Sequence, residues 1–510
     1  MSALKIQAPE VRLLAEPKVL CKVSAETDCK RALLGGPYAA RRQSHPNRIS
    51  VGLIGTYNLV DKATKWLAQV NEPIESKSEK RSTEALTQER HKLLFPDFPG
   101  CPAVFEKMVV CEPQFEQKIA LDEFKQLDKS NEFTFIESLL RSIESKIERI
   151  AKVADKKPDV ILLLLTEEVY ELCHIVGDYH RRLRKPRIID ANQLDLFKDF
   201  DTLQLSPRVD TDKLVSRNLR SALKKIAMNP VYGVPIQIIR ENTLLGKETQ
   251  NLATRSWNLC TGLYYKTGDL PWILDAMDAK SCFLGISFYH KKTAYRDYVF
   301  SSMAHLFSND FNSVVLRGDP VPFDSVLKAP VLDREAAQKI VEKALSEYFN
   351  SRESYPERLV IHKTSRYTDA EIEGFEGALS NKGMAYDLVS LTKAPLRLIR
   401  WGQYPMPRAA AYEFSDRDAY LYTKGFIPDL QTYPGSHIPS PFWVHKARGD
   451  SSIDTICSEI LMLTKLNWNT ADFCCGVPIT VSFARNVGDV FKEFREQDQF
   501  EPSRFFRFYM

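Results

Sequence analysis

Four polar side chains between residues 217 and 272 have the types and the spacing to bind a phosphate group. Arg220 and Lys224 are four residues apart, so they share one face if their segment is helical. Gln237 ends the strand-like segment "VPIQ", and Lys266 closes a second helical segment. A guanidinium, two ammonium groups and an amide could donate together to one terminal phosphate, which carries two negative charges. Spacing alone, however, favours separate surface charges over such a site.

The elements that would position these residues alternate between strands and helices in the first half of the chain. The segment "NRISVGLIGT" is apolar and β-branched, as in a buried strand, and the spacing of "NLVDKATKWLAQV" predicts a helix. "PDVILLLLT" is apolar on both faces, which is typical of a central parallel strand. The alternation predicts a doubly wound α/β fold. Its further members are a strand "KMVVCE", a long amphipathic helix from Phe135, a helix near 167–184, a basic helix end at 180–187 and a strand at 234–239.

The second half starts a new sheet after "KTGDLPW", so we place a domain boundary near residue 275. The segment "SCFLGISFYH" reads as a buried strand that contains Ser287. Strand-like and helical segments then mix, with helices expected at 334–349 and 453–464. This pattern predicts a mixed α/β domain.

Composition is that of an ordinary soluble globular protein, with 44% apolar and 27% charged residues. No apolar run approaches the roughly 20 residues that a membrane span needs, and the N-terminus lacks the apolar core of a signal peptide. We therefore expect a cytoplasmic protein without a membrane partner. The ten cysteines include no CxxC pair, which predicts reduced thiols rather than a zinc site. The net charge of +4 is too small to indicate nucleic-acid binding by itself.

The segment from 217 to 272 resembles the MID domain of Argonaute proteins. In that family a helix with a Tyr, His or Arg and a Lys four residues later is followed by "PxQ" and by a "K(L/A)GG.PW" turn, and these groups hold the 5′ phosphate of a guide strand. The matching positions here are Arg220, Lys224, Gln237 and Lys266, with "KTGDLPW" standing for the turn. The resemblance thus implies a guide phosphate site at these four residues.

The segment "TRSWNLCTGLYYKTGDLPW" most resembles the corresponding segment of short prokaryotic Argonautes, which consist only of MID and PIWI domains. The segments "RLVIHKTSRYTDAEIEGF", "YPGSHIPSPFWV" and "LTKLNWNTADFCCGVPITVSFARNVGDVF" also resemble PIWI segments. The resemblance implies an α/β protein with a Rossmann-like MID domain and an N-terminal extension at 1–275. An RNase H-like PIWI domain is expected at 276–510.

Active PIWI domains use Asp and Glu side chains to hold two divalent ions, and this sequence departs from that pattern. Ser287, Thr364 and Arg485 occupy the places of three ligands. Two hydroxyl groups and a guanidinium cannot neutralise two divalent ions, and Arg485 would repel them. We therefore expect a catalytically inactive domain. The alternative is a register shifted by one or two residues, in which Asp369 or Glu371 would supply carboxylates. Asp319 lies in the general region of the family's glutamate finger.

The resemblance also implies contacts outside the phosphate site. Four basic residues could follow the nucleic-acid backbone, namely Arg397, Arg400, Lys424 and Lys465. In the family the terminal carboxylate can hold a metal ion beside the guide phosphate, which implies Mg²⁺ at Met510. The nearby aromatic residues Phe505, Phe506 and Tyr509 could equally be core residues.

A protein that binds without cutting needs an effector. Short Argonautes are typically encoded beside a partner with an APAZ region and a TIR, sirtuin-like or nuclease domain. The resemblance thus implies guide RNA, single-stranded target DNA and such an effector protein as partners, with NAD depletion as the output in prokaryotic immunity. Two alternatives remain: an active guide-directed nuclease, and an unrelated nucleotide-binding α/β enzyme. The sequence lacks the GxGxxG fingerprint that would support the last one.

Overall fold

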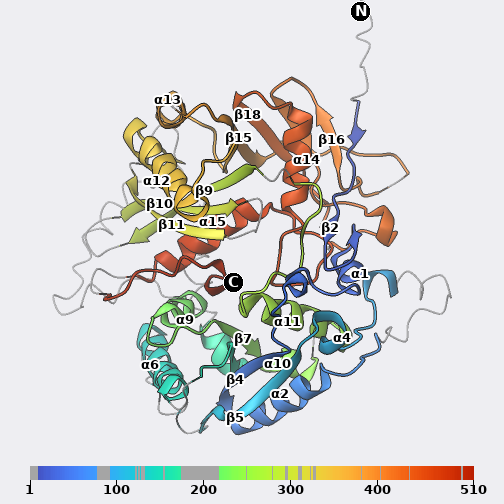
Figure 1. Cartoon of the computed structure of the whole chain (residues 1–510), viewed down its shortest axis with the longest axis vertical. Helices are drawn as coiled ribbons and strands as arrows, with labels where there is room; N and C mark the ends of the chain where they lie inside the picture. Colours follow the sequence, from blue (N-terminus) through green and yellow to red (C-terminus); the bar gives the residue numbers. More distant parts are fainter. Residues whose placement is uncertain are drawn as a thin grey trace, which may run out of the picture.

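The computed structural model describes residues 10–76, 92–120, 123, 127, 132–152, 156–173, 218–247, 250–277, 280–292, 297–307, 313–321, 323–324, 329–380, 382–402, 404–435, 437–494 and 498–510. The basic run at 180–187 and the second half of the helix expected near 167–184 lie outside these residues. Figure 1 shows two lobes, with the C-terminus between them.

The first lobe is built on a parallel four-stranded sheet in the order β5-β4-β6-β7. The predicted strands and helices of this half are confirmed: β4 (Arg48–Thr56), α2 (Tyr57–Gln69), β5 (Met108–Ile119), α6 (Glu132–Lys152), β6 (Val160–Leu165), α9 (Leu219–Met228), β7 (Ile236–Arg240) and α11 (Leu252–Lys266). All six residues of β6 are buried, as expected for a central parallel strand. The short helices of this lobe are α1 (Cys29–Leu33), η1 (Tyr38–Arg41), α4 (Cys101–Phe105) and α10 (Glu241–Leu245).

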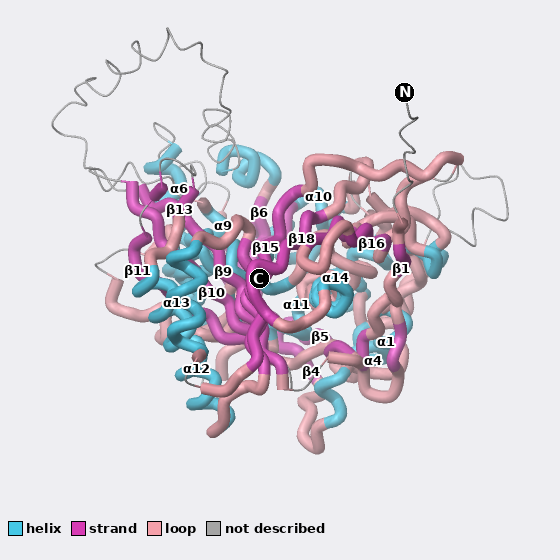
Figure 2. Tube along the Cα trace, turned by 90° about the horizontal axis from the view of Figure 1, so that it is seen from above, coloured by secondary structure: helices cyan, strands magenta, loops and turns pink. Residues whose placement is uncertain are grey.

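The second lobe contains a nine-stranded mixed sheet in the order β1-β16-β17-β18-β15-β14-β9-β10-β11. Its strands are β1 (Arg12–Leu13), β9 (Ser281–Lys292), β10 (Asp297–Phe307), β11 (Ser313–Val321), β14 (Arg358–Lys363), β15 (Ala385–Lys393), β16 (Ala410–Glu413), β17 (Asp418–Leu421) and β18 (Phe442–Gly449). The helices are α12 (Arg334–Arg352), α13 (Asp369–Leu379), α14 (Ile453–Leu463), α15 (Ile479–Phe491), η5 (Pro428–Leu430) and η6 (Phe506–Phe508). A two-stranded sheet joins β12 (Phe323–Asp324) and β13 (Ala329–Pro330). Seen from above, the long sheet strands run through the middle of the molecule (Figure 2).

The chain passes from one lobe to the other between β8 (Ile273–Leu274) and β9, close to the expected boundary. β8 belongs to a small sheet with β2 (Val19–Leu20) and β3 (Ala25–Glu26). The strand β1 does not follow the expected division of the chain into two domains at residue 275. β1 pairs with β16, so these residues join the sheet of the second lobe.

Side-chain alternation places the two faces of β9 in different cores. Cys282, Leu284 and Ile286 pack with residues of α12 and α13. Phe283 and Tyr289 pack instead into the core that includes α14 and α15. Ser287 lies between these last two in the alternation, so it faces the α15 side of the sheet.

Candidate nucleic-acid interface

The side chain of Lys224 is buried within a cluster of cations. Asn218 caps the start of α9 by accepting from the backbone N–H of Ser221 at 3.2 Å. Arg220 in the first turn remains exposed, whereas Lys224, one turn later, is 8% exposed. Burial lowers the pKa of Lys224 well below its usual value, and the charges of Arg220 and Lys266 lower this pKa further. These three cations therefore lie close enough to destabilise one another's charged forms.

Lys266 completes this cluster from the last turn of α11. Its side chain is 1% exposed, and burial followed by the charge of Arg220 lowers its pKa to about 7. The Lys266 Nζ donates to Asn469 Oδ1 over 3.5 Å. A buried ammonium without a carboxylate partner in this contact is costly in the free protein. Such a group is suited to an incoming anion.

Gln237 forms no hydrogen bond to this cluster within the described part of the chain. Its amide donates weakly to the carbonyl of Ile238 at 3.4 Å, and its side chain lines a cavity of about 540 Å³. Asn469, the partner of Lys266, lines the same cavity, together with Arg240 and Asn258. The structure thus places three of the four predicted phosphate contacts in one cluster and the fourth in a cavity that it shares with Asn469, the hydrogen-bond partner of Lys266.

Arg507 is a further cation near this cluster, and the sequence analysis did not predict it. Gly268 follows α11 with φ +100°, and a Cβ there would lie 2.5 Å from Arg507 Nη1. The same Nη1 donates to the carbonyl of Thr267 at 3.1 Å, while Nε is buried without a hydrogen-bond partner among the described residues. A basic residue in the aromatic tail was the only signal in the sequence.

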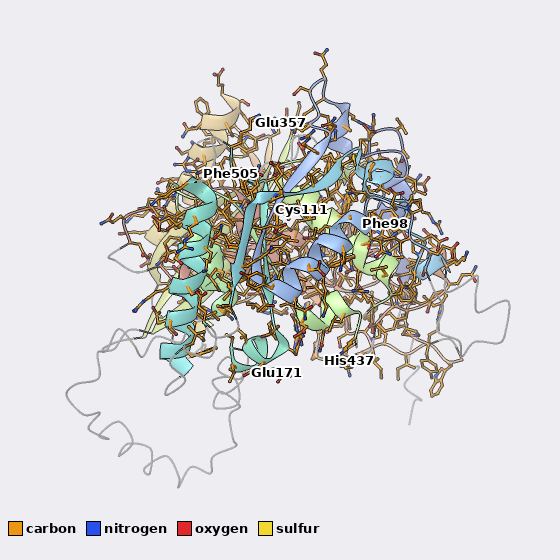
Figure 3. All side chains as sticks on the ribbon, turned by 90° about the horizontal axis from the view of Figure 1, so that it is seen from below. Phe98, Cys111, Glu171, Glu357, His437 and Phe505 are labelled. Carbon is orange, nitrogen blue, oxygen red and sulfur yellow. The ribbon has the colours of Figure 1, made fainter. Side chains whose placement is uncertain are left out.

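The tail itself reaches the cluster. Tyr509 accepts a hydrogen bond from Lys224 Nζ through its carbonyl, and its hydroxyl donates to the carbonyl of Ser503 at 2.7 Å. Phe506 and Tyr509 are buried, as the core interpretation predicts. Phe505, labelled in Figure 3, is 64% exposed and therefore does not fit that interpretation.

The groups around Lys224 fit a phosphate better than a metal ion. Mg²⁺ takes oxygen ligands, mainly carboxylates and water, but two of the three charged groups that act on the pKa of Lys224 are cations, Arg220 and Lys266, and only Asp489 is a carboxylate. Within the described part of the chain, no group of three or more His, Cys, Asp or Glu side chains could hold a metal ion. Met510 is buried beside Tyr509. Mg²⁺ at Met510 stays a prediction from the resemblance.

The positions that replace the expected metal ligands come together in the second lobe. Ser287 on β9, Thr364 directly after β14 and Arg485 on α15 all line one cavity of about 420 Å³. Gly285 makes this possible, because α15 approaches β9 so closely that a Cβ would lie 2.1 Å from the carbonyl oxygen of Thr480. The structure thus brings these three positions together in one cavity.

Glu371 and Asp369, the carboxylates of the alternative register, do not line this cavity. Glu371 is fully buried and accepts from Lys363 Nζ and from the backbone N–H groups of Leu332 and Thr368, so its oxygens are occupied. Asp369 is exposed at the start of α13 and is not a lining residue. Asp319 belongs to β11, and its side chain lies outside the described part. The described lining includes one carboxylate, that of Asp489, which the sequence analysis did not predict.

The four residues expected to follow a nucleic-acid backbone divide into two groups. Arg397, Arg400 and Lys424 are exposed, and Lys424 lines a third cavity of about 310 Å³. Lys465 differs, because it is 3% exposed, donates to the carbonyls of Thr27 and Phe473, and pairs with Glu16 at 2.5 Å. The prediction for Lys465 is wrong: its ammonium is used inside the protein, where no strand could reach it. Sequence alone does not reveal burial of a single lysine.

No helix within the described ranges combines the length and apolar character that crossing a bilayer requires.

Three comparisons place this geometry among known proteins. No family model matches the chain. "Protein argonaute" of Aquifex aeolicus is 24% identical over 310 residues, which cover 59% of this chain and 39% of that protein. The structure of Clostridium butyricum Argonaute bound to a guide DNA and a 19-mer target DNA matches 96% of this chain and 53% of its own, with a TM-score of 0.61 and 14% identity. A crystal structure of A. aeolicus Argonaute matches 96% of this chain and 54% of its own, with a TM-score of 0.55 and 16% identity.

The chain spans about half the length of the structures it matches. The expected fold class is confirmed, because the likeness covers nearly the whole chain. The chain is therefore similar in sequence to an Argonaute protein, and its mixed α/β fold matches the C-terminal half of Argonaute structures, the MID and PIWI domains.

Proposed function

We propose that this protein is a guide-dependent nucleic-acid sensor of prokaryotic immunity. It binds the 5′ phosphate of a guide, which we assign as RNA, through Arg220, Lys224 and Lys266. The guide then pairs with complementary single-stranded DNA, so that base pairing supplies the sequence specificity and the protein recognises the backbone. The target is bound without being cut.

One contrast between the two lobes supports this proposal. The first lobe buries two ammonium groups beside a guanidinium, with pKa values that burial and mutual repulsion lower. A doubly charged terminal phosphate would relieve that repulsion through charge-assisted hydrogen bonds. The cavity in the second lobe instead presents Ser287, Thr364 and Arg485 where two divalent ions would need carboxylates.

A sensor that does not cut needs another protein to produce a response. We propose that an APAZ-containing effector with a TIR or sirtuin-like domain binds this chain and consumes NAD when guide and target are both bound. The resemblance to short Argonautes supports this step, and the catalytic activity is assigned to the partner.

The guide site is tested by the preference for a 5′ phosphate. Lys224→Met combined with Lys266→Met keeps most of the side-chain volume but removes two cations, each worth about 1.5–3 kcal/mol in a charge-assisted contact. We expect the variant to lose at least about 100-fold of its preference for 5′-phosphorylated over 5′-hydroxyl guide RNA. Lys65→Met on the exposed surface of α2 is the control and should keep the preference. An unchanged preference in the double variant would refute the site.

The sensor role is tested with the protein purified together with its genomic neighbour. Complementary single-stranded DNA should trigger NAD consumption only with a matching guide, and end-labelled target should remain intact in magnesium. Target cleavage would instead favour the guide-directed nuclease. Failure of target DNA to trigger any NAD consumption would contradict the proposed effector output.

A further inference from the structure

The cavity around Ser287 carries positive rather than negative charge. Arg485 on α15 and Lys492 at the C-cap of this helix line it, and Asp489 lies between them at steps of four and three residues. Lys492 Nζ pairs with Asp489 Oδ1 at 2.6 Å, so this pair is close to neutral. The guanidinium of Arg485 therefore leaves the cavity with about one net positive charge.

Hydroxyl groups form the opposite side of this cavity. Ser287, Thr364 and Ser365 line it from β9 and from the end of β14. Ser365 Oγ is buried and has no hydrogen-bond partner among the residues that the structure describes. A buried hydroxyl without a partner costs free energy, and an oxyanion could accept its proton. Hydroxyl and guanidinium donors around one space form a site for an anion, not for a divalent cation.

From these groups we propose that the cavity binds one phosphodiester of a nucleic-acid strand directly, without a metal ion. The inference rests on the proposed function, which supplies the nucleic acid. Arg485 takes the charge-neutralising role that metal ions have in a nuclease centre, and the serine and threonine hydroxyls orient the phosphate oxygens. The lost carboxylates thus mark a change of ligand, from a metal ion to the strand itself.

Charge and size both favour a phosphodiester over other anions. A phosphodiester carries one negative charge, which matches Arg485, the one cation of the described lining outside the Lys492–Asp489 pair, whereas the terminal phosphate with two charges suits the cluster at Lys224 and Lys266. A volume of about 420 Å³ admits a nucleotide-sized group.

The helix α15 connects this cavity with the guide cluster. Asp489 lines the cavity and also acts on the pKa of Lys224 through its charge. Arg485 is one turn earlier, about 6 Å along the helix axis. α15 also contacts α9, which carries Lys224. A nucleic acid anchored at the cluster therefore passes within reach of the cavity.

The test combines a neutral backbone linkage with removal of the guanidinium. The full-length protein is loaded with guide RNA, and the Kd for complementary DNA is measured by fluorescence anisotropy in EDTA. A methylphosphonate, which removes the charge of one linkage, is moved stepwise along the target and then along the guide. We expect one linkage at which it weakens binding about tenfold in the wild-type protein and has no further effect in Arg485→Ala.

Three controls make the result specific. Arg485→Lys should restore part of the affinity, and Lys339→Ala on the exposed surface of α12 should change nothing. The circular dichroism spectrum and the unfolding midpoint of Arg485→Ala should match those of the wild type, which shows that the fold is intact. The slope of log Kd against log salt should fall by about one unit in Arg485→Ala.

Several outcomes would overturn the proposal. These are equal target affinity for Arg485→Ala and wild type, additive effects at every methylphosphonate position, or loss of wild-type target binding in EDTA while the guide stays bound. Competition by inorganic phosphate without any sensitive linkage would identify a site for the free ion instead of the strand. None of these results would remove the 5′-phosphate preference that tests the proposed function, so the two failures are distinguishable.

Discussion

Lys224 and Tyr509, which are 285 positions apart in the chain, are joined by a hydrogen bond of 2.5 Å from the lysine Nζ to the tyrosine carbonyl oxygen. The contact ties the C-terminal tail to the cluster that we assign to the guide phosphate. It also explains how Lys224 remains buried in the free protein, because the carbonyl partly replaces the water that burial removes. An incoming phosphate would supply a stronger, charged acceptor for the same ammonium.

Guide binding should depend on pH in a direction set by Lys266. Its pKa is lowered to about 7, so it loses its proton as the pH of the free protein rises above that value. The phosphate favours the charged form, and binding above pH 7 must therefore take up a proton, which weakens affinity by up to about tenfold per pH unit. Below about pH 6 the terminal phosphate itself becomes protonated. Anisotropy titrations between roughly pH 5.5 and 9 cover the pKa of the phosphate and that of Lys266. They should show the strongest binding between about pH 6 and about pH 7.

A 5′-hydroxyl guide serves as the control for that profile. Its affinity should vary little over the same pH range, since it has no terminal phosphate to bind at the cluster. An equally steep alkaline loss with this guide would place the titrating group elsewhere.

Restoring carboxylates should convert the cavity of the second lobe into a metal site. Ser287→Asp, Thr364→Asp and Arg485→Asp together place three carboxylates where hydroxyls and a guanidinium now lie. We expect Mn²⁺ to bind with a Kd of roughly 10⁻³ M or tighter, as at weak carboxylate sites. Calorimetry or Mn²⁺ electron paramagnetic resonance measures it. The triple Asn variant, similar in shape but uncharged, should not bind, and binding by both variants would contradict the electrostatic argument.

Gly285→Ala should destabilise the second lobe. The added Cβ would lie 2.1 Å from the carbonyl of Thr480, so α15 must move away from β9. Overpacking of this kind costs about 1–3 kcal/mol, which denaturant unfolding can measure. Gly377→Ala on α13 meets its nearest atom at 3.8 Å and should be neutral or stabilising by up to about 1 kcal/mol. Similar unfolding midpoints for the two variants would show that the close approach is not required.

Glu371→Gln tests whether this carboxylate is structural. Glu371 and Lys363 form a fully buried ion pair, and neutralising one member leaves the other charge buried without compensation. We expect a loss of about 3–5 kcal/mol in unfolding free energy. Glu373→Gln, whose partner Arg334 is 67% exposed, should cost less than about 1 kcal/mol. A marginal effect of Glu371→Gln would reopen the possibility of a role in ligand binding.

Much of the fold could be predicted from the sequence because the patterns are local. The run "VILLLL" reads as a buried strand whatever surrounds it, and it forms β6. The pairing of β1 with β16 could not be predicted, because it depends on where two distant segments meet and leaves little trace in two residues.

The sequence by itself determined which side chains are available: cations at residues 220, 224 and 266, and no carboxylate at residues 287, 364 and 485. Only the tertiary structure decided what each environment does to them. Burial lowers the pKa of Lys266 and removes Lys465 from the surface, while Arg485 and Ser287 meet in one cavity because Gly285 lets α15 approach β9. Desolvation and contact between distant segments are properties of packing, and residue type and spacing do not specify them.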